Sequence, residues 1–292
     1  MLHVATVHYR SARWIEIQTR QLREHLSVDY MTWTSLEGID PSYGSRFDRV
    51  LRQHGRHAGK LNHLALEISH EADEDDLIMF LDGDAFPIAD PMPVVAQGLE
   101  RAPLVAIRRL ENLREPQPHP SFCVTSVRTW RSLPGDWSLG CTWRTPTGRT
   151  ITDVGGNLRR ALELSETPWV PLLRSNGQAV HPVFFGIYAD VIYHHGAGFR
   201  DSYVTRTDRE RLVREVARRS ATQQLLARAR NRLLGRAWNQ DANERIRDTS
   251  EQIFAAIERG EIEWLKTMQG PAMSLAEELD GAGERRPLTL GE

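Results

Sequence analysis

A short apolar run that ends in two aspartates constrains the fold of this 292-residue chain more than any other feature. Residues 77–81 are all apolar and are typical of a buried strand, and Asp82 and Asp84 follow with one glycine between them. In an open α/β sheet, ligands bind beyond the carboxyl ends of the strands. Because strand side chains alternate with a period of two residues, both carboxylates are expected to point the same way. They would repel each other unless a cation lay near them.

The rest of the chain predicts an α/β fold around this strand. Strand 2–8, helix 12–26 and strand 28–34 form a βαβ pattern, which indicates a parallel sheet. Further elements are predicted from apolar spacing and breakers: helix 57–70, strand 77–81, a helix that ends near residue 101, strand 103–108, a strand at FCVTSV, helix 153–164 and a strand at VIY, 191–193. The fold class is therefore α/β, with a Rossmann-type sheet flanked by helices.

Composition narrows the function classes. The apolar fraction is 40% and the charged fraction 26%, which supports a sizeable core. A net charge of −2 does not favour nucleic acid as a partner. Cys123 and Cys141 lack metal-ligand spacing and are expected to be reduced thiols. The amino terminus does not resemble a signal peptide, and no stretch approaches the roughly 18 apolar residues of a membrane span. A cytoplasmic protein is expected.

The character of the chain changes after about residue 204. We expect a first domain over 1–204 and a helical extension with a polar tail over 205–292. Residues 206–236 hold ten arginines and an apolar stripe, so a basic amphipathic helix that lies on an anionic membrane surface is one interpretation. The other is a helix packed on the first domain with a solvated basic face, or a contact in a homo-oligomer. Residues 241–268 predict one more amphipathic helix.

A divalent metal that holds a diphosphate is the favoured interpretation of the acidic turn. Hard cations such as Mg²⁺ and Mn²⁺ prefer oxygen ligands and bridge to phosphates. The alternative is a surface turn, since Asp-Gly is also turn chemistry. Gly83 would let the protein backbone approach closely and would relieve crowding between the two aspartates.

Five segments resemble, in order and spacing, the nucleotide-sugar-dependent glycosyltransferases of the GT-A fold, bacterial family 2-like enzymes among them. The first is FLDGDAFP, which resembles their D-x-D segment. The others are HAGKLNHLALE before it, HPSFCVTSVRTWRSL and TDVGGNLRRAL after it, and VIYHHGAGFR, which is similar to a late His-x-Gly segment that supplies a metal ligand. The resemblance spans about residues 3–200. It implies a GT-A-like mixed sheet and a metal-dependent enzyme that moves a sugar from a nucleoside-diphosphate sugar to a sugar, lipid-linked or small-molecule acceptor.

The resemblance also implies a metal site. Asp84 and one late histidine would hold the ion, and Asp82 would contact the ribose or assist the metal. His194 fits the His-x-Gly pattern better than His195, and by alternation only one of the two rings can face the metal. Imidazole slightly favours Mn²⁺ over Mg²⁺.

Several polar residues are candidates for binding the nucleotide-sugar. Thr6, His8, Tyr9 and Arg10 lie at the end of the first strand, where the nucleoside would lie in this architecture. Lys60 and Asn62 could join them from the helix, together with Asp82 and Gly83 at the acidic turn. Arg200, in a glycine-bearing loop, could neutralise the pyrophosphate. For most of these the alternative is an ordinary solvated loop or helix face.

Asp153 is the candidate general base. Glycosyl transfer with inversion needs a carboxylate that accepts the proton of the acceptor hydroxyl, so Asp153 predicts an inverting reaction. The segment TDVGGNL could equally place Asp153 at a helix N-cap.

Three other functions remain open. A phosphatase or phosphotransferase of the haloacid dehalogenase type also has D-x-D after a strand, but Phe86 stands where that class usually has Thr or Val. A nucleotidyltransferase usually has a glycine-rich loop after its first strand, and VHYRSARW contains no glycine. A cation-dependent carbohydrate-binding protein would bind sugar without a nucleotide.

Overall fold

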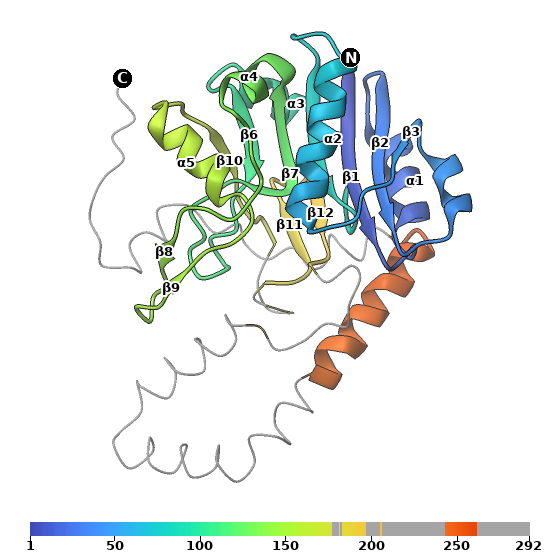
Figure 1. The fold of residues 1–292 in the computed structure, drawn as a ribbon. Helices are drawn as coiled ribbons and strands as arrows, with labels where there is room; N and C mark the ends of the chain where they lie inside the picture. Colours follow the sequence, from blue (N-terminus) through green and yellow to red (C-terminus); the bar gives the residue numbers. More distant parts are fainter. Residues whose placement is uncertain (177–180, 182, 197–204, 206–242, 262–292) are drawn as a thin grey trace, which may run out of the picture.

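The structure, a computed structural model, describes residues 1–176, 181, 183–196, 205 and 243–261. Its centre is a seven-stranded sheet in the order β10-β6-β7-β4-β1-β2-β3 (Figure 1). The strands of this sheet are β1 (Leu2–Tyr9), β2 (Tyr30–Glu37), β3 (Arg49–Leu51), β4 (Leu77–Asp82), β6 (Leu104–Ile107), β7 (His119–Ser126) and β10 (Val170–Leu172). The α/β class with a mixed sheet is confirmed.

One strand of this sheet runs against the others. β1 pairs in parallel with β2 and β4, and β2 with β3. β7 lies antiparallel to both β4 and β6, and β6 is parallel to β10. The first residue of β7 therefore lies at the edge where the other strands end. This edge is at the bottom of Figure 1.

Helices cover both faces of the sheet. They are α1 (Ile15–His25), α2 (His57–Glu71), α3 (Met92–Leu99), α4 (Val127–Ser132) and α5 (Gly156–Leu164), with a 3₁₀ turn η1 (Pro41–Arg46). Alternate residues of β4 enter two cores: Ile78 and Phe80 pack towards α2, α4 and α5, whereas Met79 and Leu81 pack towards α1 and α3. A strand buried on both faces reads as the continuous apolar run seen in the sequence.

A second, three-stranded sheet lies at the carboxyl edge of the first. It consists of β5 (Ala85–Pro87), β12 (Ile192–His194) and β11 (Gly186–Tyr188), all antiparallel. A two-stranded ribbon, β8 (Trp143–Arg144) and β9 (Thr150–Ile151), projects nearby (Figure 1). β5 is the direct continuation of the acidic turn after β4, so the small sheet connects residues 85–87 with residues more than a hundred positions later.

A helix over residues 243–258 packs against the same edge (Figure 1, orange). Ile253, Phe254 and Ile257 share a core cluster with Trp14 and Phe86. This helix falls within the predicted amphipathic segment 241–268. Arg200 and the arginine-rich residues 206–236 lie outside the described residues.

The sequence missed the short elements. β3, β5, β10 and β11 have three residues each, too few to show a period, and the reversed direction of β7 depends on long-range pairing. Cys123 is buried, Cys141 is partly exposed, and neither forms a disulfide.

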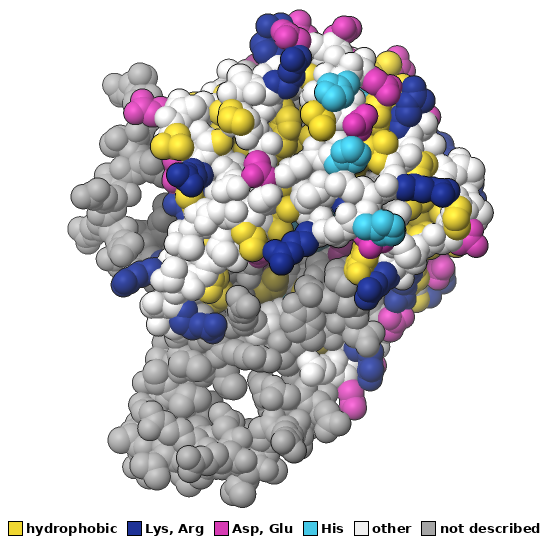
Figure 2. Space-filling model, viewed as in Figure 1, with side chains coloured by type: hydrophobic (Ala, Val, Ile, Leu, Met, Phe, Trp, Pro, Cys, Tyr) yellow, Lys and Arg dark blue, Asp and Glu magenta, His cyan; other side chains and the backbone are white. Residues whose placement is uncertain are grey.

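The described surface carries mixed charge. On the face that carries α2, acidic and basic side chains alternate with polar and hydrophobic ones (Figure 2). This mixture agrees with a net charge of −2. Within the described ranges, no helix is both long and apolar enough to cross a bilayer.

Candidate functional site

A cleft of about 550 Å³ lies at the carboxyl edge of the large sheet. Its walls come from segments far apart in the sequence: Val7, His8, Tyr9, Ser11, Trp14, Gly55, Arg56, His57, Lys60, Asp82, Gly83, Asp84, Arg109, His119, Asp153, His194 and Gly196. Its position follows from the topology, because parallel strands and the loops after them meet at this edge.

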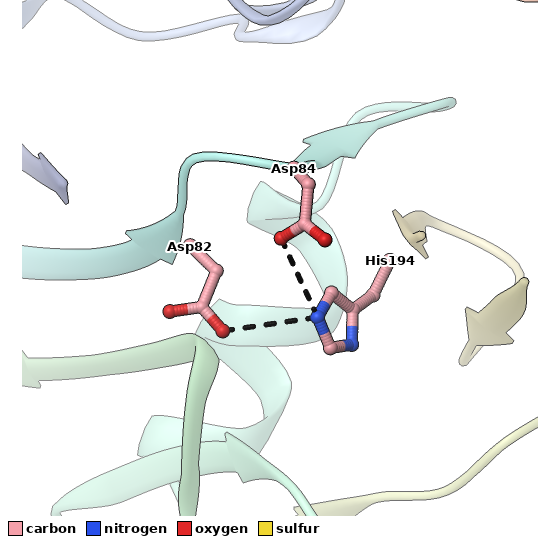
Figure 3. Close-up of side chains that lie close together, drawn as sticks. All are labelled: Asp82, Asp84 and His194. Carbon is pink, nitrogen blue, oxygen red and sulfur yellow. Dashed lines mark ion pairs between the residues drawn. The ribbon is translucent and has the colours of Figure 1, made fainter. Parts of the chain in front are cut away.

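Asp82, Asp84 and His194 converge at the floor of this cleft (Figure 3). The Nε2 atom of His194 lies 3.7 Å from Asp82 Oδ2 and 3.6 Å from Asp84 Oδ1. All three side chains are buried. They meet because β12 pairs with β5 in a register that sets His194 opposite Ala85, the residue after Asp84.

Each carboxylate uses its second oxygen for a contact that orients it. Asp82 Oδ1 lies 2.8 Å from His57 Nε2, and Asp84 Oδ2 accepts a hydrogen bond of 2.9 Å from the Gly196 backbone N–H. Burial would raise the pKa of Asp82, but the neighbouring His57, His119 and His194 outweigh it and hold the pKa well below its usual range. Burial lowers the pKa of His57, and the carboxylate of Asp82 more than reverses this, so the pKa of His57 is raised.

The three inward atoms fit a divalent cation. Two carboxylate oxygens and one imidazole nitrogen lie within 4.8 Å of one another. Carboxylates suit Mg²⁺ and Mn²⁺, and imidazole is a ligand that Mn²⁺ accepts more readily than Mg²⁺ does. The outer contacts of Asp82 and Asp84 are of the kind that orient the ligands of a metal site.

His195 faces away from this cluster. Its Nδ1 lies 3.0 Å from the Tyr193 hydroxyl and its Nε2 lies 2.7 Å from Ser250 Oγ, in helix 243–258. Burial lowers the pKa of His195 to about 3. Both ring nitrogens are occupied, so the geometry favours His194 over His195 as a ligand, and strand alternation explains why the two rings diverge.

His119 lines the cleft and was not predicted. It is the first residue of the reversed strand β7, and its ring centroid lies 5.8 Å from that of His194. The Ser121 N–H donates to His119 Nδ1 over 3.1 Å. The neutral ring therefore carries its proton on Nε2 and can donate a hydrogen bond but cannot bind a metal through that atom. Burial lowers the pKa of His119 well below its usual value, which keeps the ring neutral.

The four candidates at the end of β1 divide into two groups. His8 and Tyr9 line the cleft, whereas Thr6 and Arg10 do not. Thr6 is fully buried and donates to the side chain of Gln18 over 3.0 Å. Burial lowers the pKa of His8 to about 4, so its ring is neutral at pH 7.

Of the two candidates on α2, Lys60 lines the cleft and Asn62 does not. Lys60 is buried, forms an ion pair with Glu37 and lies 4.5 Å from the centroid of the Tyr9 ring. Asn62 lies away from the cleft, where it donates to Asp136 and accepts from the Trp137 N–H. Asn62 therefore holds a loop in place.

Gly83 belongs to the cleft wall, and its lack of a side chain is required there. A Cβ atom would lie 2.5 Å from the Val7 carbonyl oxygen and 2.8 Å from His8 Nδ1. Any other residue would push the acidic turn away from β1.

Asp153 lines the cleft, and 41% of its side chain is exposed. Its Oδ2 lies 3.2 Å from an Arg109 nitrogen, and its Oδ1 accepts from the Val154 N–H. Arg109 is anchored in turn by the fully buried Glu115. Asp153 is not the N-cap of α5, because that position is Gly155.

His57, His119 and Arg109 are three of the cleft residues that the sequence did not reveal as functional. His57 was predicted only as the start of a helix, and His119 lay before the predicted strand FCVTSV, whereas β7 begins at His119 itself. Arg109 follows β6, the neighbour of β7. The available signal was that a basic residue lies near the strand ends at this edge. That signal could be recognised for His119 only if β7 was already known to run antiparallel to its neighbours.

No family model matches the chain, and no curated protein matches it by sequence. Among solved structures, the chain is similar to TarS of S. aureus, with 10% identity and a TM-score of 0.35 over 47% of this chain. It is similar to the glycosyltransferase GlyE of Streptococcus pneumoniae TIGR4, with 16% identity and a TM-score of 0.34 over 44% of this chain. These alignments span only 30% and 35% of the two matched chains.

A third similar structure is the mannosyltransferase PcManGT of Pyrobaculum calidifontis, in complex with GDP-Man and Mn²⁺. The identity is 14% and the TM-score 0.43, over 88% of this chain and 86% of that one.

Proposed function

We propose that this chain is a metal-dependent glycosyltransferase, which moves a sugar from a nucleoside-diphosphate sugar to an acceptor hydroxyl group. The observation that carries this proposal is the convergence of Asp82, Asp84 and His194 in a cleft that also contains Asp153. A volume of about 550 Å³ is within the range of small-molecule sites.

Asp82 Oδ2, Asp84 Oδ1 and His194 Nε2 would hold the cation, Mn²⁺ in preference to Mg²⁺. When bound, the cation would stabilise the negative charge that develops on the departing diphosphate. With these three residues as ligands, the cation would still have room to bind oxygen atoms of a diphosphate. The Nε2–H group of His119 would donate a hydrogen bond to the same diphosphate.

We assign the nucleoside to the end of the cleft formed by β1 and α2. His8 would present an unprotonated ring nitrogen to a hydroxyl group there. Tyr9 would present an aromatic ring, and Lys60 a cation already balanced by Glu37. Thr6 and Asn62 would not touch the nucleotide but would hold neighbouring segments in place, because both form hydrogen bonds outside the cleft.

We assign the acceptor to the end that carries Asp153. As general base, Asp153 would take the proton of the acceptor hydroxyl while that oxygen attacks the anomeric carbon. The buried Arg109–Glu115 pair would fix the orientation of its carboxylate. This assignment supports an inverting reaction, since the base and the diphosphate would lie on opposite sides of the sugar.

The experiment is a panel of UDP- and GDP-sugars incubated with the metal-stripped protein and added Mn²⁺. The proposal expects Mn²⁺-dependent hydrolysis of one or more of them, and its loss in Asp84→Asn. Equal turnover with EDTA, or in Asp84→Asn, would refute it.

The same protein preparation separates the other functions. Release of phosphate from p-nitrophenyl phosphate would favour a phosphatase. Pyrophosphate-dependent formation of nucleoside triphosphate from the nucleotide-sugar would favour a nucleotidyltransferase. Sugar binding that is indifferent to the nucleotide would favour a carbohydrate-binding protein.

A further inference from the structure

One buried amide ties helix α1 to both ends of the acidic turn. Gln18 is fully buried, and its Nε2 donates to the carbonyl oxygen of Asp82 over 2.8 Å and to that of Ala85 over 2.7 Å. Its Oε1 accepts from the Thr6 hydroxyl over 3.0 Å and lies 3.1 Å from His8 Nε2. All the hydrogen-bonding capacity of one side chain is thus spent on the first strand and this turn.

The two carbonyl groups flank the segment whose geometry decides whether a cation can bind. Asp82 and Ala85 are the first and last residues of the turn, with Gly83 and Asp84 between them. Their carbonyl oxygens are held by the same nitrogen, so the ends of the turn cannot move apart without breaking a buried hydrogen bond. Leaving a buried polar group without a hydrogen-bond partner is unfavourable, so the clamped geometry is favoured. This constraint acts on the spacing between the carboxylates of Asp82 and Asp84.

The same amide fixes the state of His8. Since Nε2 of Gln18 donates twice, its Oε1 is the atom that faces Thr6 and His8, and both must donate to it. His8 therefore carries its proton on Nε2, and its Nδ1 is left as an acceptor beside Gly83.

We propose that Gln18 is a positioning residue for the cation site: it sets the spacing of Asp82 and Asp84 by clamping the turn that carries them. The role rests on the proposed function only in that the site holds a cation. Simple packing does not explain the residue, since burying an amide offers no gain over burying a methylene chain. On the same helix the buried positions Ile15, Ile17 and Leu22 are filled by apolar side chains, although Thr19 and Gln21 are also buried.

The test compares Gln18→Met with Gln21→Met. Gln21 lies on the same helix and is as well buried, but among the described residues its Nε2 donates only to Glu24, so its replacement is a matched control. Mn²⁺ binding would be titrated by the loss of the free-ion electron paramagnetic resonance signal, at a temperature where thermal unfolding shows each variant to be folded. Loss of an orienting group should weaken Mn²⁺ binding about tenfold or more. Gln21→Met should bind as the wild type does.

A second variant, Gln18→Glu, separates the effect of positioning from the effect of charge, and it replaces Gln18→Met if that variant does not fold. A glutamate keeps the acceptor for Thr6 and His8 but cannot donate to the two carbonyl groups as a carboxylate. Its added negative charge would by itself tighten the binding of a cation. Positioning predicts the opposite, a weaker affinity for Mn²⁺.

Unchanged or tighter Mn²⁺ binding in the Gln18 variants, with tight binding in the wild type, would overturn the proposal. No binding of Mn²⁺ by the wild type would overturn it as well. Failure of the proposed function has a different signature: the wild type would bind Mn²⁺, Gln18→Met would bind it weakly, and no nucleotide-sugar would be turned over.

Discussion

Four histidines from four elements surround the acidic turn, and each has a different role set by its neighbours. His57 pairs with Asp82, and His194 faces both carboxylates. His8 and His119 are neutral rings of the same tautomer, with the proton on Nε2, but they leave opposite atoms for the cleft: His8 its acceptor Nδ1, and His119 its donor Nε2–H. Residue type alone does not distinguish these roles, because the partner of one ring nitrogen decides which nitrogen is left for a ligand.

His119→Ala tests the donor role. Because His119 is not a ligand in this account, Mn²⁺ affinity should stay within about twofold of the wild type. Binding of UDP or GDP in the presence of Mn²⁺ should weaken by about five- to tenfold, the value of one hydrogen bond. Calorimetric titration of both measures the two effects separately. A large loss of Mn²⁺ affinity would show that His119 acts as a ligand instead.

Asp153→Asn tests the base. The substitution keeps the shape of the side chain but removes its ability to accept a proton, so transfer should fall by about 10²–10⁴-fold. Binding of the donor should be unchanged, because the proposed function assigns the acceptor, and not the donor, to Asp153. Transfer at the wild-type rate would remove Asp153 from the mechanism.

His8 predicts a pH dependence of stability. Its pKa is lowered from 6.5 to about 4 by burial, so the unfolded chain binds a proton in this window and the folded chain does not. Stability should therefore fall as the pH drops from 6.5 to 4, by up to about 3 kcal/mol from this group. Urea unfolding of the metal-free protein at several pH values should show a smaller fall for His8→Asn. Parallel curves for the two proteins would contradict the assignment.

At the scale of elements, two pairings assemble the site. β7 is reversed and brings its first residue to the edge where β4 ends, and β12 pairs with β5 to bring His194 beside the acidic turn. Helix 243–258 supports the same region: Ser250 holds His195, and Phe254 packs on Trp14 with ring centroids 4.9 Å apart. Trp14 lines the cleft, so the helix forms the layer behind its wall.

Phe254→Ala tests this support. Phe254 is buried and lies between Trp14 and the guanidinium of Arg13, which is 3.4 Å from its ring centroid. Its truncation should lower the free energy of unfolding by about 3 kcal/mol or more. Gln252→Ala, on the exposed side of the same helix, should change it little. Equal effects of the two substitutions would show that the helix does not stabilise this region.

The sequence predicts those elements whose signal is local. β1, α1, β2, α2 and β4 have clear apolar periods, and the structure contains each of them near its expected bounds. The meeting of Asp82 and Asp84 with a late histidine was expected from the resemblance. The direction of β7 and the pairing of β12 with β5 depend on contacts between distant residues, which no local period records. His119 and Arg109 were missed for that reason.

At the scale of the whole molecule, opposite charges meet at one edge of the sheet. The cleft contains three aspartates together with Arg56, Lys60 and Arg109, although the surface charge is mixed. Asp82 and Asp84 lie at the end of β4, the central strand of the sheet, and the basic side chains come from loops and from α2 around it. A doubly charged cation at the centre would turn this arrangement into a site for a diphosphate.

Anomalous diffraction at the manganese edge, from crystals grown with Mn²⁺ and a nucleoside diphosphate, tests the central claim most directly. We predict one peak bounded by Asp82 Oδ2, Asp84 Oδ1 and His194 Nε2, with phosphate oxygens completing the coordination. A peak elsewhere, or a diphosphate bound in the cleft with no manganese beside these three atoms, would contradict the account.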